Sequence, residues 1–397
     1  MNIAVVTSLY PVPLRPFEGI FAARRWEGML KRGHAVRVVH ALPWAPLPLG
    51  RYRALAQAPA HEVRDGVPVL RPRHLHVPGR PRGNAARFAQ RALAVLLAGP
   101  RPDIVVCDYA WPASALAPLL RTARWPGDPQ RVPCVVNGRG SDVLQVAGEA
   151  GLGRDLGANL AAADGWCAVS QDLVDALDRV AGGPARGVLV PNGVDMELFS
   201  PGDRAAARRT LGLAADGALV VVVGHLIERK DPLLALEAFH AGAPAGARLV
   251  FVGRGALAAA VEARAAQLGL GARVALVGER PPAELRDWYR AADALLLTSR
   301  REGRPNVVLE ALASGTPVIA TEAGGTGELL RDPRWLHRGR EPEAIGGLLR
   351  AALDAPPAPE ELRAAVEPLS WRASFETLER FLASVTAAVR SREGSAA

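Results

Sequence analysis

Residues 294 to 320 read Ala294-Leu-Leu-Leu-Thr-Ser-Arg-Arg-Glu-Gly-Arg-Pro-Asn-Val-Val-Leu-Glu-Ala-Leu-Ala-Ser-Gly-Thr-Pro-Val-Ile-Ala320. Leu295 to Leu297 form an apolar run typical of a buried strand. Pro305 suits the first position of a helix, and Gly315 ends that helix before a strand that starts at Val318. The stretch therefore predicts a βαβ unit. In open α/β sheets such a loop lies at the carboxyl end of a strand, where ligands bind.

Two carboxylates belong to this unit, Glu302 in its loop and Glu310 inside its helix. Glu310 stands in an apolar segment, so it must find hydrogen-bond donors, pair with an arginine, or raise its pKa. Gly303 and the helix start at Asn306 and Val307 offer backbone N–H groups to an anion. A second glycine-rich turn follows and suits the same phosphate site, with Gly324, Gly325, Gly327 and Glu328.

The spacing Glu302-x7-Glu310 lies inside Ser-x2-Glu-Gly-x-Pro-x3-Leu-Glu-Ala-x-Ala-x-Gly-x-Pro-Val. This pattern resembles the signature of the family 4 retaining glycosyltransferases, also called group 1 glycosyltransferases. The resemblance covers almost the whole chain and is strongest over residues 188–330. It implies an α/β fold of the GT-B type, with two Rossmann-like doubly wound domains facing across a cleft. It also implies that Glu310 holds the nucleotide ribose and that Glu302 lies beside the donor sugar.

The length of 397 residues favours two domains. We expect an acceptor-side domain over residues 1–195, and the turn Pro191-Asn192-Gly193 marks its end. A nucleotide-sugar-binding domain is expected over residues 196–369. The resemblance implies that a terminal helix, residues 370–397, crosses back to the first domain.

Cysteine usage and hydropathy favour a cytoplasmic protein. Its three cysteines, Cys107, Cys134 and Cys167, lie in apolar segments without zinc-ligand spacing, so we expect buried free thiols. The apolar runs are shorter than the roughly 18 residues that span a membrane. The amino terminus shows no signal-peptide pattern and enters a strand directly.

The net charge of +8 favours anionic partners. Residues 42–82 are rich in proline and arginine with few regular signals, and an amphipathic helix is expected over residues 84–98. This basic segment with its aromatic residues suits peripheral contact with the inner membrane face. We favour the alternative, a solvated insertion whose helix packs on its own sheet, because surface charge is common.

Three positions in the first domain are candidates because they follow predicted strands. Gly19 matches the glycine that in the resembled family lies near the donor phosphates, although an ordinary turn glycine is an equal alternative. Arg139 stands where many family members have a histidine, which suggests that it contacts a donor hydroxyl or an acceptor phosphate. Asp142 is either a ligand or a cap of the next turn.

A cationic loop follows the valine-rich strand that starts at Ala218. Lys230 is one of only two lysines in the chain, and its compact ammonium suits a diphosphate; the alternative is an exposed loop lysine. In the resembled family an arginine after the glycine and a lysine five residues later bind phosphate. Here His225 follows Gly224, so Arg229 is expected to compensate. The resemblance places Arg280 beside the nucleobase.

Together with these residues, the resemblance implies a retaining hexosyltransferase that moves a sugar from a nucleoside diphosphate sugar to a glycan or lipid-linked acceptor. The resemblance favours UDP and cell-envelope polysaccharide synthesis. No Asp-x-Asp pair occurs, so we expect neither a metal nor another cofactor. One alternative is an enzyme that only rearranges or hydrolyses a nucleotide sugar. The other is a non-catalytic nucleotide or nucleic-acid binder, which the scarcity of aromatic residues disfavours.

Overall fold

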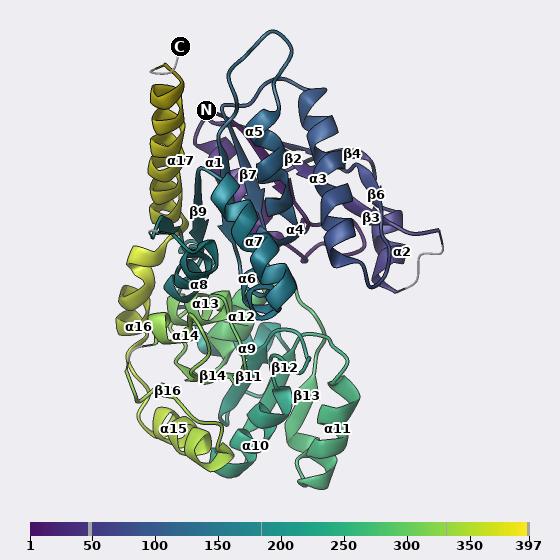
Figure 1. The fold of residues 1–397 in the computed structure, drawn as a ribbon. Helices are drawn as coiled ribbons and strands as arrows, with labels where there is room; N and C mark the ends of the chain where they lie inside the picture. Colours follow the sequence, from purple (N-terminus) through teal and green to yellow (C-terminus); the bar gives the residue numbers. More distant parts are fainter. Residues whose placement is uncertain (47–49, 184, 331, 395–397) are drawn as a thin grey trace. The chain divides into compact units, whose positions relative to one another are not determined.

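The computed structural model describes residues 1–397 except 47–49, 184, 331 and 395–397 (Figure 1). The chain forms two compact units. Unit 1 comprises Met1–Asn192 with Ser374–Ala397, and unit 2 comprises Gly193–Ala373. Each unit is an α/β structure built on its own sheet, so the expected fold class is confirmed.

Unit 1 contains an eight-stranded sheet in the order β10-β9-β8-β7-β1-β2-β5-β4. Its strands are parallel except for β4, which runs antiparallel to β5. The central strands are continuous apolar runs because both faces of the sheet are covered. The strands are β1 (Asn2–Thr7), β2 (Ala35–His40), β4 (His61–Arg64), β5 (Val67–Leu70), β7 (Ile104–Asp108), β8 (Cys134–Gly138), β9 (Gly165–Ala168) and β10 (Gly187–Leu189).

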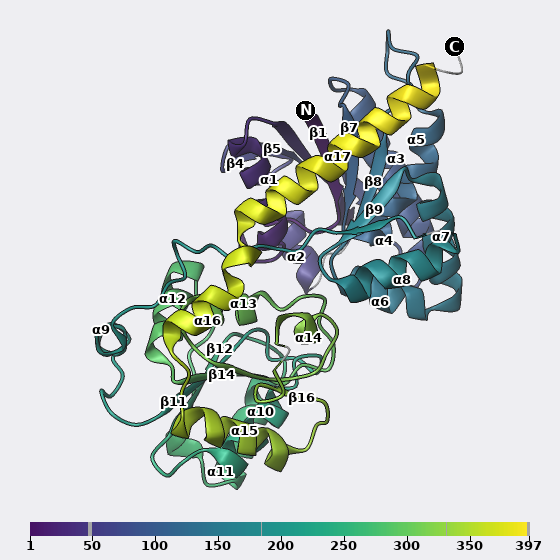
Figure 2. The same ribbon diagram turned by 90° about the vertical axis from the view of Figure 1, so that its left-hand side faces the viewer.

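Alternate residues of β1 point to opposite faces of this sheet. Ile3 and Val5 pack against helix α1 (Ile20–Lys31) and the carboxyl-terminal helix. That terminal helix, α17 (Trp371–Gly394), lies along the sheet of unit 1 and buries Leu378 and Phe381 there (Figure 2). The other face packs on α3 (Pro81–Leu97), α5 (Ala117–Thr122), α7 (Ala150–Ala162) and α8 (Gln171–Ala181).

Unit 2 contains a six-stranded parallel sheet in the order β13-β12-β11-β14-β15-β16. The strands are β11 (Leu219–Val223), β12 (Arg248–Val252), β13 (Val274–Leu276), β14 (Ala294–Leu297), β15 (Val318–Thr321) and β16 (Leu336–His337). One face packs on α10 (Pro232–Gly242), α11 (Ala258–Gln267) and α15 (Pro342–Asp354), and the other on α12 (Pro282–Ala291), α13 (Asn306–Ala313) and α16 (Pro359–Val366). Residues 294–321 form β14, a loop, α13 and β15.

The segment over residues 42–82 is more regular than expected. Strands β4 and β5 extend the main sheet, and β3 (Leu42–Trp44) pairs with β6 (Arg73–Leu75) in a small separate sheet. A short helix, α2 (Arg51–Ala56), lies between β3 and β4. The sequence did not predict these strands, because Pro43 and Pro68 lie inside β3 and β5, and a composition rich in proline and arginine is typical of loops. Residues 47–49 of this segment lie outside the described residues.

Several local expectations need correction. Helix α3 begins at Pro81 rather than residue 84, in the first helical turn where proline is favoured. Pro305 is the residue before α13 and not its first helical position. Ser170 precedes α8 and is of a residue type that commonly caps helices, but its buried hydroxyl makes no capping hydrogen bond. The three cysteines are free and buried, as expected. Among the described residues no helix is long and apolar enough to cross a membrane.

Candidate active site

The loop after β11 and the loop after β14 meet through an ion pair. Lys230 Nζ lies 2.5 Å from Glu302 Oε1. Both loops follow neighbouring parallel strands, and the carboxyl ends of such strands lie at one edge of the sheet. The structure therefore brings together the two residues to which the sequence analysis gave separate catalytic roles.

Two further donors hold the carboxylate of Glu302. Ser299 Oγ donates to Oε1 at 2.6 Å, and Arg229 Nη1 lies 3.5 Å from Oε2. Burial opposes ionisation of Glu302, but the charge and hydrogen bond of Lys230, with Ser299 and Arg229, outweigh it and hold the pKa of Glu302 below its usual range. Glu302 is thus a buried carboxylate whose charge is compensated by cations.

Asp231, next to Lys230, makes the cationic loop rigid. Its φ of 47° places it in the left-handed region, which is costly for a non-glycine residue. Its carboxylate accepts from Leu234 N at the start of α10 and from Arg340 Nη2 at 2.7 Å, and it pairs with Arg300 at 2.6 Å. These contacts fix the backbone that carries Lys230. Lys230 itself therefore needs little further ordering to meet a ligand.

Gly224, the residue after β11, needs to be a glycine. Its φ is 141°, which side chains rarely adopt, and a Cβ there would lie 3.8 Å from Lys230 Cε. The neighbouring His225 is exposed, and its carbonyl accepts from Ile227 N at 3.0 Å.

The turn at Gly303 and the glycine-rich turn at Gly324 and Gly325 lie side by side. Gly325 N donates to the carbonyl of Gly303 at 3.1 Å. Arg304 and Glu328 cross-link the same turns at 3.2 Å, and burial lowers the pKa of Arg304. Helix α13 starts beside Gly303 without a side-chain cap. Backbone N–H groups at this helix start are therefore available to an anion.

Asn306 and Val307 form the first helical positions of α13, as the expected phosphate site requires. Asn306 Oδ1 is buried without a hydrogen-bond partner among the described residues. A buried amide oxygen of this kind is costly unless a ligand or water donates to it. This atom adds an acceptor to the site next to the free N–H groups.

Glu310 lies on the buried side of α13 with 5% of its surface exposed. Tyr289 Oη, on α12, donates to Glu310 Oε2 at 2.9 Å. The hydroxyl of Thr316 in turn donates to the carbonyl of Tyr289 at 2.6 Å. This chain of contacts orients the carboxylate. The sequence did not reveal Tyr289, because only the fold brings α12 against α13.

Arg280 follows β13, in the loop that the family resemblance assigned to the nucleobase. Its Nη2 donates to the carbonyl of Val277 at 2.9 Å, and its Nη1 lies 3.5 Å from Glu284. The guanidinium is thus tied to its own loop and helps to shape it.

The other two predicted site residues, Gly19 and Arg139, belong to unit 1 and not to unit 2. Gly19 precedes α1 with a φ of 74°, and a Cβ would come within 3.0 Å of the backbone of Leu9 and Tyr10. Only glycine fits this close approach. The alternative of an ordinary turn glycine therefore has a specific structural reason.

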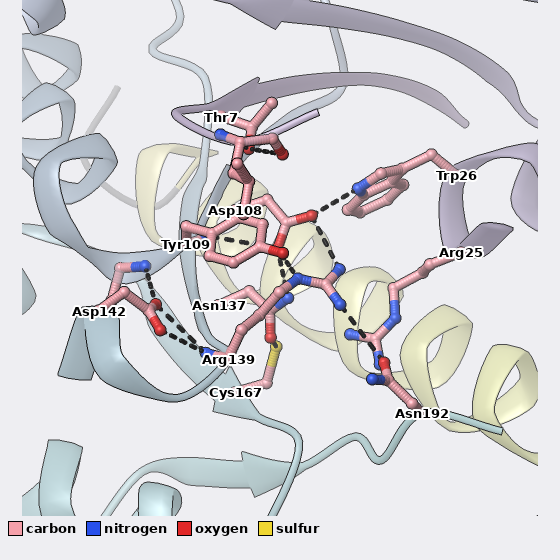
Figure 3. Close-up of polar contacts among 12 residues, drawn as sticks. Thr7, Arg25, Trp26, Asp108, Tyr109, Asn137, Arg139, Asp142, Cys167 and Asn192 are labelled. Carbon is pink, nitrogen blue, oxygen red and sulfur yellow. Dashed lines mark hydrogen bonds and ion pairs between the residues drawn. The ribbon is translucent and has the colours of Figure 1, made fainter. Parts of the chain in front are cut away.

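Arg139 is bound to a buried carboxylate at the carboxyl end of β7. Its Nε and Nη2 donate to Asp108 at 2.6 and 2.8 Å, and Trp26 Nε1 and Asn137 Nδ2 also donate to Asp108 (Figure 3). Burial opposes ionisation, but Arg139 above all holds the pKa of Asp108 below its usual range. The guanidinium contacts the ring of Tyr109, so it is enclosed on several sides.

The same network reaches Asn192, the last residue of the first segment of unit 1. Asn192 Oδ1 accepts from Arg139 Nη1 at 3.3 Å and from Arg25 Nη2 at 3.1 Å (Figure 3). Arg25 is fully buried on α1, and burial and the charge of Arg139 lower its pKa to about 10. Asp142 Oδ2 accepts from the N–H of Ala110 at 2.6 Å and also bonds the N–H of Arg139, so it joins two loops rather than only capping its own helix.

Sequence reasoning missed this network, although it left signals. Arg25 interrupts the apolar face formed by Ala22, Trp26 and Met29 at helical spacing. Asp108 directly follows the apolar residues of a buried strand. A charged residue in either position must find a partner inside the protein.

Two family models together match most of the chain. Residues 203–367 match "Glycosyl transferases group 1", and residues 21–198 match "Glycosyltransferase Family 4". A D-inositol 3-phosphate glycosyltransferase of Catenulispora acidiphila is 31% identical over 367 residues, which cover 85% of this chain and 84% of the relative. A Bacillus subtilis glycosyltransferase ascribed to teichuronic acid biosynthesis is 29% identical over 340 residues, 83% of each chain.

Solved structures share the fold at low sequence identity. Sucrose-phosphate synthase of Thermosynechococcus elongatus has a TM-score of 0.79 at 20% identity and covers 98% of this chain and 100% of its own. The Anabaena protein HepE in complex with UDP has a TM-score of 0.68 at 18% identity, with 100% of both chains covered. These likenesses establish the two-domain GT-B fold.

Proposed function

Because the chain belongs to the group 1 glycosyltransferases, we propose that it moves a hexosyl group from UDP to a glycan or lipid-linked acceptor with retention of anomeric configuration. Unit 2 binds the donor, and the donor diphosphate needs no metal ion. The observation that carries the proposal is the pairing of Lys230 with Glu302 at the carboxyl edge of the sheet of unit 2.

Lys230 supplies the positive charge for the departing diphosphate. An ammonium has three N–H donors, and the bond to Glu302 uses one of them. The other two are available to phosphate oxygens, while Glu302 keeps the ammonium in place. Arg229, the residue before Lys230, contacts the same carboxylate and adds a second cation. Preorganised charge of this kind stabilises a leaving group better than mobile charge does.

The helix start after Gly303 receives the second phosphate, and the ribose lies against Glu310. Tyr289 donates to Oε2 and so orients the carboxylate of Glu310, which suits a group that accepts hydrogen bonds from a diol. Arg280 borders the base. Gly224 and His225 lie under the diphosphate, where a glycine lets the backbone approach closely.

In the retaining reaction the bond from the anomeric carbon to the UDP oxygen breaks on the same face at which the acceptor oxygen bonds. The leaving phosphate takes the acceptor proton, so no separate side-chain base is required. Glu302 orients the sugar ring as positive charge develops on it. The acceptor binds to unit 1.

The relatives support both substrates. HepE structures contain UDP and UDP-glucose, which supports a UDP-linked donor. The names of the Catenulispora and Bacillus relatives refer to a phosphorylated inositol acceptor and to a cell-envelope polymer. We therefore propose a hydroxyl-rich acceptor and a role in cell-envelope polysaccharide synthesis.

A panel of nucleotide sugars tests the proposal by thermal shift, because a ligand that binds only the folded state raises its stability. We expect UDP-sugars to give the largest shifts. The preferred donor is then incubated with candidate acceptors, and NMR of the product gives its anomeric configuration. An inverted product would refute the retaining mechanism, and release of free sugar without any acceptor would support a hydrolase instead.

A further inference from the structure

Unit 1 contains a cavity of about 640 Å³ that none of the site residues described above lines. A volume in the range of roughly 300–1,000 Å³ is typical of small-molecule sites. Residues from the start of α3 and from the start of α7 form its wall, so two helices separated in sequence enclose it. The residues that matter for its chemistry are Arg80, Arg82, Arg87, Gly83, Gly151 and Glu149.

The charge of the cavity wall is positive. Three arginines face one glutamate there. Arg82 shares its charge with Asp155 at 2.6 Å. Arg87 instead donates to two neutral oxygens, the carbonyl of Leu75 at 2.9 Å and Asn84 Oδ1 at 2.8 Å. These neutral contacts orient the guanidinium of Arg87 and leave its positive charge available to an anion.

Two glycines let the arginines lie against the backbone. A Cβ on Gly151 would lie 3.0 Å from Arg82 Nη2, and a Cβ on Gly83 would lie 3.5 Å from Arg87 Nη2. A side chain at position 151 would crowd the guanidinium of Arg82, and a side chain at position 83 would take up space in the cavity. The cavity wall thus combines fixed guanidinium groups with open space in front of them.

The wider electrostatic setting favours the same kind of ligand. Residues 42–98 contain nine arginines and two acidic residues, Glu62 and Asp65, which leaves seven of the chain's net eight positive charges in this segment. Such a concentration of one sign raises the local concentration of anions. The cavity also lies toward the carboxyl edge of the sheet of unit 1. Helices α3 and α7 lead into parallel strands β7 and β9, so both begin toward the carboxyl edge, where Asp108 lies.

We propose that this cavity binds a phosphoryl or carboxylate group carried by the acceptor, with Arg87 and Arg80 as its contacts and Arg82 as the neighbour that holds the start of α7. The inference rests on the proposed function in that it names the chemical class of the acceptor. The anion belongs either to a soluble sugar phosphate or to the head group of a lipid-linked acceptor, since both present the same chemistry.

The test is titration of the full-length protein with inorganic phosphate by calorimetry, with saturating UDP present so that the diphosphate site of unit 2 is filled. Arg80→Gln/Arg87→Gln should weaken phosphate binding roughly ten- to a hundredfold, the scale of losing hydrogen bonds to a charged group. Arg91→Gln on the same helix is the matched control, because Arg91 is exposed and does not line the cavity. It should bind phosphate as the wild type does.

Two further arms identify the source of the anion. Glucose 6-phosphate in the titration and sedimentation with phosphatidylcholine vesicles containing phosphatidylglycerol are both compared with the same variants. If the double variant loses only the binding of glucose 6-phosphate, the acceptor is soluble. If it loses vesicle binding, the anion belongs to a lipid head group. Either loss supports the cavity.

A measurement on the wild type removes any dependence on variant folding. Phosphate should protect Arg80 and Arg87, but not Arg91, from modification by phenylglyoxal, as read by mass spectrometry. Equal phosphate affinity in all variants, or equal modification with and without phosphate, would overturn the inference. If UDP does not bind, the proposed function fails by itself. The phosphate titration is then repeated in Lys230→Ala and decides on the cavity separately.

Discussion

Lys230 Nζ and Glu302 Oε1 lie 2.5 Å apart, although the sequence suggests one of them for the diphosphate and the other for the sugar. Glu302 has 6% of its surface exposed, and its depressed pKa means that it is ionised at neutral pH. The ammonium of Lys230 stabilises the buried carboxylate of Glu302 and is also the proposed contact of the substrate diphosphate. The two roles are therefore coupled, and variants of either residue must be interpreted together.

Lys230→Ala should lower turnover roughly 100-fold or more, the scale of losing one preorganised charge at a transition state. It should also destabilise unit 2, because Glu302 then retains only Ser299 and the more distant Arg229. Adding Glu302→Gln should recover stability but not turnover. Melting curves and steady-state rates of both variants measure this. Normal turnover in Lys230→Ala would mean that Lys230 only neutralises Glu302.

Substitutions of Glu302 and of Glu310 should have different effects. Glu310→Gln keeps the hydrogen bond from Tyr289 but loses the charge, so UDP affinity should fall by roughly 1.5–3 kcal/mol. Glu302→Gln should reduce turnover and change UDP affinity less than Glu310→Gln does, because its proposed ligand contact is with the sugar and the amide oxygen can still accept from Lys230. Calorimetry with UDP and with the full donor separates them. An unchanged UDP affinity in Glu310→Gln would remove the ribose role.

Most of the fold could be predicted because its strands are short apolar runs ended by glycine or polar residues. The strand expected at Leu295 to Leu297 is β14, and the strand expected to start at Val318 is β15, since their apolar patterns are strong. The segment around β4 and β5 could not be predicted in this way. Its arginines read as solvent-exposed, whereas Arg71 is fully buried against Glu62 and the carbonyl of Pro11. Burial of a charge depends on partners that only the tertiary structure supplies.

The candidate site shows the same limit. Motif spacing was sufficient to select Lys230 and Glu302, and the sheet topology explains why they meet. The contacts of Arg139 could not be inferred from its position in a motif. Its partners Asp108 and Asn192 lie 31 and 53 residues away in sequence and meet it only at the carboxyl edge of unit 1.

Arg139→Ala should destabilise unit 1 by about 3–5 kcal/mol, because Asp108 would remain as a buried charge without its main partner. Arg139→Ala/Asp108→Asn should recover part of this loss. UDP affinity should not change, since the donor residues belong to unit 2. If Arg139 contacts the donor sugar instead, Arg139→Ala will weaken the full donor more than UDP, which calorimetry on the folded variant detects.

UDP should bind without added divalent metal, because Lys230 and Arg229 supply positive charge at the proposed diphosphate site. Calorimetry in the presence of EDTA tests this, and the affinity should equal that measured with magnesium. Lys230→Ala is the appropriate control, since its UDP affinity should fall under both conditions. Binding that EDTA abolishes and magnesium restores would contradict the metal-free model.

Stability of unit 1 should fall as the pH decreases from about 6.5 to 5, because the buried His40 and the partly buried His74 are held as neutral rings. Burial, followed by the charge of Arg71, lowers the pKa of His40 to about 3, and burial, followed by His76 and Arg87, lowers the pKa of His74 to about 4. Both folded-state pKa values lie below the unfolded value of 6.5 that each histidine has in model peptides. The unfolded chain therefore binds protons first as the pH falls.

The contribution of these histidines is fully present above pH 6.5 and is lost as the pH falls toward their folded-state pKa values. Each should contribute a slope of up to about 1.4 kcal/mol per pH unit below pH 6. His40→Gln/His74→Gln should flatten the decline in the free energy of unfolding, measured by denaturant titration at pH 7, 6 and 5. His61→Gln, which alters an exposed histidine on β4, should leave the slope unchanged. An equal slope in the double variant and the wild type would show that other groups, the carboxylates first among them, control acid unfolding.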